Sequence, residues 1–66
     1  MAVLKVIEVL ADSTKSWEDA ALNAVNKASE TVKNICSVYI KEQSCVVEDG
    51  KITRYRVNVK ITFEVN

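Results

Sequence analysis

The stretch TRYRVNVKITFEV, residues 53–65, alternates apolar and polar side chains almost without interruption. Because successive side chains of a β-strand point to opposite faces of a sheet, this pattern predicts a strand with one dry and one wet face. The predicted dry face carries Thr53, Tyr55, Val57, Val59, Ile61, Phe63 and Val65. The predicted wet face carries Ile52, Arg54, Arg56, Asn58, Lys60, Thr62 and Glu64. The rest of the chain must fold around this strand.

A second strand is predicted immediately before it, from residue 35 to residue 47, where apolar side chains recur with a period of two. Residues 48–51 (EDGK) join the two strands, since an Asp-Gly pair supplies the positive φ angles of a tight hairpin turn. Cys36 has the parity of Val38 and Ile40, so we expect it to be buried. Cys45 has the opposite parity and is expected to be exposed.

The N-terminal half predicts a strand followed by a helix. Residues 2–10 (AVLKVIEVL) are rich in apolar and β-branched types, and the polar residues 11–16 predict a loop. Ser16 is a favourable N-cap for a helix of about 18 residues. Its apolar stripe, with spacings of three and four, consists of Trp17, Ala21, Ala24, Val25, Ala28, Val32 and Ile35.

The resulting order is β-α-β-β, an α+β fold in a single domain spanning residues 1–66. A right-handed crossover makes the first and second strands parallel and leaves the position between them for the third. We therefore predict a three-stranded antiparallel-type sheet of order 1-3-2 wrapped on one helix.

The lengths of these elements predict self-association. A third strand of about 13 residues spans roughly 43 Å, whereas a helix of about 18 residues spans roughly 27 Å. The helix cannot cover the whole dry face, so the remainder must be covered by another subunit or, alternatively, by long strands that curl around the helix. A chain of 66 residues also has little core of its own, which favours an obligate homo-oligomer.

Composition excludes several classes of function. The chain has no His, one Gly, and nine basic residues balanced by nine acidic ones. Histidine-based catalysis, Gly-rich phosphate loops and general nucleic-acid binding are therefore not expected, and we do not predict an enzyme. Lys5 and Glu8 interrupt the apolar N-terminus, which argues against a membrane span. Two cysteines without CxxC spacing favour a reduced, cytoplasmic protein.

Over essentially its whole length the sequence resembles the dodecin family of small β-α-β-β proteins that assemble twelve copies into a hollow shell. The resemblance rests on Val3-Leu4-Lys5-Val6, the helix start Ser16-Trp17, and residues 30–35 (ETVKNI) leading into the second strand. It continues in Glu42-Gln43 and in Tyr55-Arg56-Val57-Asn58-Val59 before Phe63-Glu64-Val65. It implies a homododecamer that stores small molecules, with riboflavin or FMN bound between subunits.

In the family, two flavins stack between tryptophans of the second strand while a glutamine of the third strand contacts the ring edge. The corresponding positions here are Ser37 and Arg56, and Tyr39 could supply a replacement ring on the face of Ser37. The resemblance thus assigns ligand binding to these three residues. Arg54 and Lys60 extend a basic stripe that could bind an anion such as a phosphate, although a solvated charged face is the alternative.

The family also includes members that lack the tryptophan and bind metal ions. This alternative implies calcium or magnesium, with Glu42 as a candidate ligand. No stretch of this sequence forms a continuous ion-binding loop, so a site of this kind would need carboxylates from several subunits.

Overall fold

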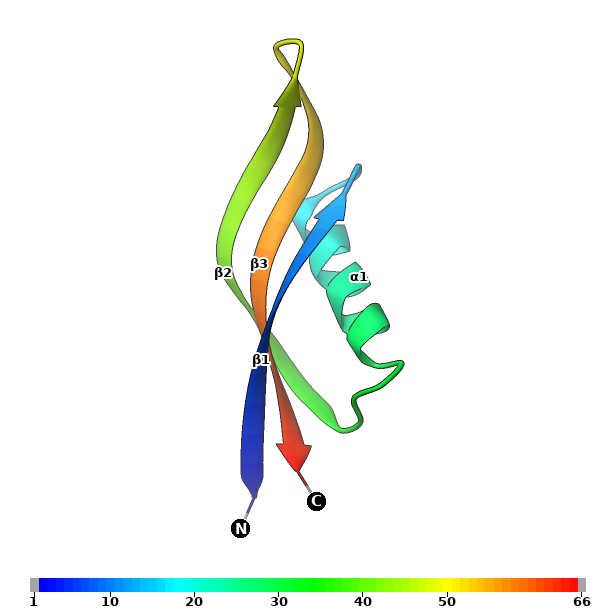
Figure 1. Ribbon diagram of the computed structural model, residues 1–66, viewed down its shortest axis with the longest axis vertical. Helices are drawn as coiled ribbons and strands as arrows, with labels where there is room; N and C mark the ends of the chain where they lie inside the picture. Colours follow the sequence, from blue (N-terminus) through cyan, green and yellow to red (C-terminus); the bar gives the residue numbers. More distant parts are fainter. Residues whose placement is uncertain (1, 66) are drawn as a thin grey trace.

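The computed structural model describes residues 2–65, so both ends of the predicted domain 1–66 lie outside it. Its central element is β3, Lys51–Val65, which pairs with β1, Val3–Ser13, on one side and with β2, Ile35–Glu48, on the other. Both pairings are antiparallel, which confirms the predicted strand order 1-3-2. The single helix α1, Trp17–Ala28, lies against one face of this sheet (Figure 1).

The helix begins where the sequence predicts it to begin. The hydroxyl of Ser16 accepts a hydrogen bond of 2.9 Å from the backbone N–H of Asp19, which satisfies one of the free donors of the first turn. Ala20, Ala21 and Ala24 are buried against the sheet. Their small side chains allow the helix to approach β3 closely.

The helix is shorter than predicted, because it ends at Ala28 after 12 residues. Residues 29–34 are rich in Ser, Thr, Val and Asn, which have weaker helix propensities than Ala. Asn34 has a φ of 62°, and its carbonyl accepts a 3.0 Å bond from the backbone N–H of Glu64 in β3. The chain has therefore already joined the sheet at Asn34, and Val32 and Ile35 of the predicted stripe lie outside the helix.

The first strand is longer than predicted. It continues through residues 11–13, which the polar sequence assigned to a loop, because Ala11, Asp12 and Ser13 pair with Val57, Arg56 and Tyr55. The turn between β2 and β3 is as predicted, with Asp49 at φ 52° and Gly50 at φ 74°.

Irregularities in β2 overturn the predicted burial of the cysteines. The register with β3 shifts between Ile35 and Ser37 and again between Ile40 and Glu42. Each shift inserts an extra residue into β2, so the alternation of its faces restarts after it. Cys36, inside the first shift, is exposed, whereas Cys45 lies opposite Tyr55 and is half-buried.

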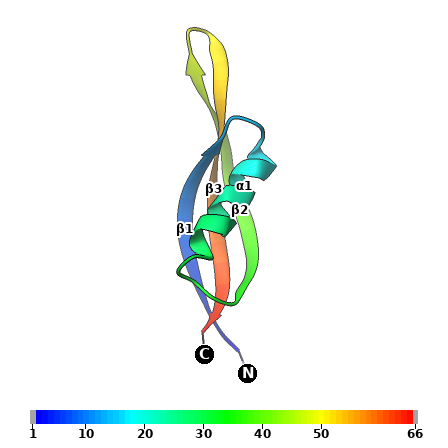
Figure 2. The same cartoon turned by 90° about the vertical axis from the view of Figure 1, so that its right-hand side faces the viewer.

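The core is narrow and lies between α1 and the middle of β3. It consists of Ala20, Ala21, Ala24, Val57, Val59 and Ile61, with Trp17, Ile7, Val9, Ala11, Ala28, Ile35 and Ile40 packed around it. The β2–β3 hairpin extends well beyond the helix, as Figures 1 and 2 show. The described chain measures 50 × 20 × 13 Å. The helix therefore leaves more of β3 uncovered than the sequence predicted, because β3 has 15 residues and α1 only 12.

Candidate functional site

The side of the sheet opposite α1 carries no covering element in residues 2–65, and we call it the open face (Figure 1). Val57, Val59 and Ile61 are buried under the helix, so the alternate residues of β3 point the other way. Strand pairing then assigns the other members of this face. They are Leu4, Val6, Glu8, Leu10 and Asp12 from β1, Ser37, Tyr39, Glu42, Ser44 and Val46 from β2, and Arg54, Arg56, Asn58, Lys60, Thr62 and Glu64 from β3.

Large apolar side chains lie on this face, which the alternation of residues 52–64 had predicted to be wet. Leu4, Val6 and Leu10 are 55%, 53% and 68% exposed, and Tyr39 is 65% exposed. Exposed apolar area of this kind, rimmed by charged groups, marks an interaction surface.

The residues predicted to bind a ligand lie in two separate places on this face. Ser37 is opposite Thr62, and Tyr39 is opposite Lys60, so these two residues of β2 share one end of the face. Arg56 pairs with Ser44 and Asp12, six residues of β3 away from Thr62, which corresponds to roughly 20 Å. One chain therefore does not bring Ser37 and Arg56 together.

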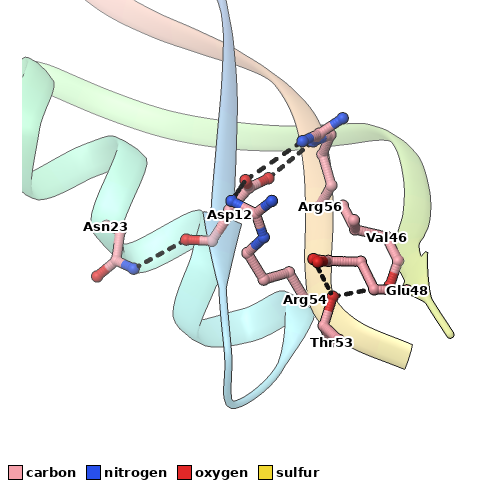
Figure 3. A network of polar contacts seen from close by, with 7 residues as sticks. All are labelled: Asp12, Asn23, Val46, Glu48, Thr53, Arg54 and Arg56. Carbon is pink, nitrogen blue, oxygen red and sulfur yellow. Dashed lines mark hydrogen bonds and ion pairs between the residues drawn. The ribbon is translucent and has the colours of Figure 1, made fainter. Parts of the chain in front are cut away.

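Arg56 belongs to an ion-pair cluster with Asp12 and Arg54 (Figure 3). Its Nε and Nη2 atoms donate to the two carboxylate oxygens of Asp12 at 2.8 and 3.3 Å. Nη1 of Arg54 donates to Oδ2 of the same carboxylate at 3.3 Å. These hydrogen bonds, chiefly those from Arg56, lower the pKa of Asp12 and raise the pKa of Arg56. Asn23 of α1 donates to the Asp12 carbonyl at 3.3 Å and ties the cluster to the helix.

The middle of the open face carries charges that nearly balance one another. Lys41 reaches Glu8 of β1 at 3.6 Å, and Asn58 donates to Glu42 at 3.4 Å. A hydrogen bond from Asn58, followed by the charge of Lys41, lowers the pKa of Glu8. Oδ1 of Asn58 is buried and has no hydrogen-bond partner within residues 2–65.

Glu42, the candidate metal ligand, therefore lies beside an amide and close to a lysine-paired carboxylate. Within residues 2–65 no three His, Cys, Asp or Glu side chains are grouped as an ion would require. An ion site that uses Glu42 would need oxygen ligands from a second copy of the chain.

Two other features lie on the helix side. Trp17 donates from Nε1 to the carbonyl of Ser44 at 3.0 Å and packs edge-on against Tyr55, with ring centroids 5.2 Å apart. It thus joins the start of α1 to the hairpin. A cavity of about 430 Å³ lies between the end of α1 and β1, lined by Ile7, Val9, Ala24, Lys27, Ala28, Glu30, Thr31 and Val32.

Asp12 is the residue that sequence reasoning missed. It was assigned to a loop, and it is 44 positions from Arg56. Extending the predicted first strand by three residues, in antiparallel register with the third strand, would have placed Asp12 opposite Arg56.

The described residues also include no helix long and apolar enough to cross a membrane.

The described residues thus form a three-stranded sheet with one face covered by a helix and one open face that carries exposed apolar and charged groups. Residues 3–66 match the sequence model of the dodecin family, and the chain belongs to that family. It is 39% identical to the calcium dodecin of Mycobacterium tuberculosis over 98% of this chain and 92% of the relative.

Solved structures agree with this assignment. The dodecin of Streptomyces coelicolor superposes with a TM-score of 0.93 at 26% identity, covering 98% of this chain and 93% of that one. The crystal structure of calcium dodecin from M. tuberculosis, described as a calcium-chelating antigen with a novel calcium-binding site, gives a TM-score of 0.85 at 33% identity. It covers 97% of this chain and 91% of the other. The predicted dodecin fold is therefore confirmed.

Proposed function

We propose that this protein is a homododecameric shell that binds small ligands between subunits, where the open faces of neighbouring chains meet. The observation that carries the proposal is the open face itself, where Leu4, Val6 and Leu10 remain more than half exposed. Burial of the part of each side chain that is still exposed contributes roughly 1–2 kcal/mol, which supplies the driving force for assembly. Family membership supports self-association.

The site would be completed by assembly. Ser37 and Tyr39 of one subunit lie at one end of the open face and Arg56 at the other, so a ligand that contacts all three would bridge two chains. We propose storage and protection of the ligand as the role, in the cytoplasm, without catalysis. Both cysteines are unpaired and lie nine residues apart on β2, which supports a reducing compartment.

The ligand could be a flavin held by Tyr39 and Arg56, with Ser37 in place of the stacking aromatic side chain. A second candidate is a divalent cation, calcium or magnesium, and the 39% identity to calcium dodecin favours it. In that case Glu42 and its equivalents in other subunits would supply oxygen ligands.

Native mass spectrometry of the purified protein tests the assembly. Twelve chains of 7.4 kDa give about 89 kDa, and retained ligands add their own mass. A monomer or dimer at micromolar concentration would overturn the proposal. Added calcium that binds at a fixed ratio per dodecamer, with no flavin retained, would select the cation candidate.

A Ser37→Trp variant tests the flavin candidate, because it restores only the missing ring. We expect it to bind riboflavin more tightly than the wild type, by up to about tenfold, because one aromatic pair contributes about 0.5–1.5 kcal/mol. Ser29→Trp, an exposed serine at the end of α1, is the matched control and should leave riboflavin binding unchanged. Equal riboflavin binding by the Ser37→Trp variant and the wild type, at an unchanged mass, would remove flavin as the ligand.

A further inference from the structure

The proposed shell needs a second contact between chains besides the open face. Open faces that meet through a two-fold axis form an isologous contact, which joins two chains and leaves no free copy of that surface. Twelve copies therefore require a further contact. A heterologous contact, in which two different surfaces of the chain meet, closes rings of chains. Two apolar surfaces that the open-face contact leaves uncovered fit this requirement.

The first surface is the hairpin tip, residues 47–52, which joins β2 to β3. Val47 and Ile52 pair with each other across the hairpin, and both are more than half exposed. The tip projects well beyond α1 in both views of the chain (Figures 1 and 2). No other element of residues 2–65 covers this apolar pair.

The proposed open-face contact does not reach the hairpin tip. That contact brings Ser37, which is opposite position 62 of β3, to Arg56 of a neighbouring chain, so the two β3 strands run antiparallel across the interface. Val65 of one chain then lies level with Thr53 of the other, and the neighbouring β3 ends before the tip begins. Leu10, which is opposite position 58, stays within the covered part.

The second surface is the cavity of about 430 Å³ between the end of α1 and β1. Ile7, Val9, Ala28 and Val32 give it an apolar lining. It lies on the helix side of the sheet, away from the open face, since Ile7 pairs with the buried Ile61. The two apolar side chains of the hairpin tip need roughly 200 Å³, at roughly 30 Å³ for each water-sized group. They fit into the cavity with space left over.

The charges at the two surfaces are complementary. Residues 48–51 (EDGK) of the hairpin tip carry two acidic side chains and one lysine. At the cavity, Lys27 and Glu30 pair with each other at 3.3 Å. Lys33 follows the lining residue 32, is exposed, and forms no ion pair within residues 2–65. Complementary charges of this kind favour one orientation of docking.

We propose that the hairpin tip of one chain docks in the cavity beside α1 of another copy, and that this heterologous contact links open-face pairs into the closed shell. The proposal rests on the proposed function and deepens it, because it names the second contact of the same assembly. Each chain contributes its tip to one neighbour and its cavity to another. The contact therefore repeats around a ring and ends when the ring closes.

Native mass spectrometry of two single variants and their combination tests the contact. Ile52→Lys places a charge on the tip and Val32→Glu places one in the cavity. Each should reduce the fraction of dodecamer at least about tenfold in favour of open-face dimers, because a charge buried without a partner is costly. The double variant should recover the dodecamer, since its two new charges meet across the contact. Leu22→Lys, at an exposed leucine of α1 outside both surfaces, is the matched control and should remain a dodecamer.

The same measurement separates this proposal from the proposed function. Dodecamers in both single variants would refute the docking of the tip and leave the shell intact. A wild type that is a monomer or dimer would instead refute the shell. Loss of the dodecamer in the single variants without recovery in the double variant would also refute direct docking.

Disulfide trapping tests the contact without added charges. In a chain that carries Cys36→Ser and Cys45→Ser, the substitutions Val47→Cys and Thr31→Cys place one thiol at the tip and one at the cavity. Oxidation of the assembled protein should link more than two chains, because each chain offers both halves of the contact. Leu22→Cys in place of Thr31→Cys is the control and should give no such product. Linked species no larger than a dimer, or no cross-link, would overturn the proposal.

Discussion

The fully buried Ala20 of α1 gives the sharpest test of the packing between the helix and the sheet. Ala20 is fully buried, and so are Val57, Val59 and Ile61 in the same cluster. Replacing Ala20 by Leu adds three carbon atoms at a fully buried position that does not line the cavity beside α1, whose lining includes Ala24 and Ala28. Either α1 lifts from β3 or side chains leave their preferred rotamers.

The expected loss in the free energy of unfolding is about 2 kcal/mol, within the usual range for overpacking a core. Leu and Ala have similar helix propensities, so the helix itself contributes little to the difference. Ala24→Leu is the matched control, because Ala24 lies on the same helix face but lines the cavity of about 430 Å³. Its added atoms have space, and we expect less than half of the loss.

Urea unfolding followed by far-UV circular dichroism measures both variants. The subunit concentration must be fixed, because the stability of an oligomer depends on it. A total stability of roughly 3–10 kcal/mol is expected for a chain of this length, so a loss of 2 kcal/mol is easily resolved. Equal losses in the two variants, or none in Ala20→Leu, would refute the packing described above.

Three further predictions concern single contacts. Trp17→Phe keeps the ring on Tyr55 but removes the donor to Ser44, and it should cost about 1 kcal/mol in urea unfolding; an unchanged midpoint would mean that the bond contributes nothing. Gly50→Ala should cost about 1 kcal/mol, because φ is 74° while no atom lies within 4 Å of the added Cβ; unaltered stability would contradict the turn. Glu8 and Asp12 have pKa values below their ordinary 4.5 and 3.8, so their stabilising effect is complete at neutral pH and is lost as pH falls below about 4.5. Acid unfolding of Glu8→Gln should therefore show a weaker pH dependence than the wild type, and identical acid profiles would dismiss Glu8 as a contributor.

Local patterns predicted the elements of this fold well. The alternation of residues 53–65 located the central strand, Ser16 located the start of the helix, and Asp49-Gly50 located the hairpin turn. Each depends on the geometry of a few consecutive residues. The excess length of the third strand over the helix was also visible, since it follows from counting residues.

Pairings between distant residues were not predictable in the same way. The register shifts of β2 reversed the burial of both cysteines, because Cys36 is itself the residue inserted at the first shift, and the insertion at the second shift moves Cys45 to the other face. The end of the helix at Ala28 depends on where the chain rejoins β3, through the contact between Asn34 and Glu64. Neither the register shifts of β2 nor the end of α1 can be recognised from a short stretch of sequence.

The sequence by itself determined the order of the strands and the helix, because periodicity and turn chemistry depend on residues that are near neighbours in the chain. Only the tertiary structure decided what the charged residues do. Asp12 and Arg56 meet through the register of β1 on β3, 44 positions apart in the chain. Ser37 and Arg56, which the family resemblance joined in one site, lie at opposite ends of the open face, because a strand separates its residues by about 3.3 Å each. The pairing of the strands determines both the contact between Asp12 and Arg56 and the separation of Ser37 from Arg56. This pairing depends on the whole fold.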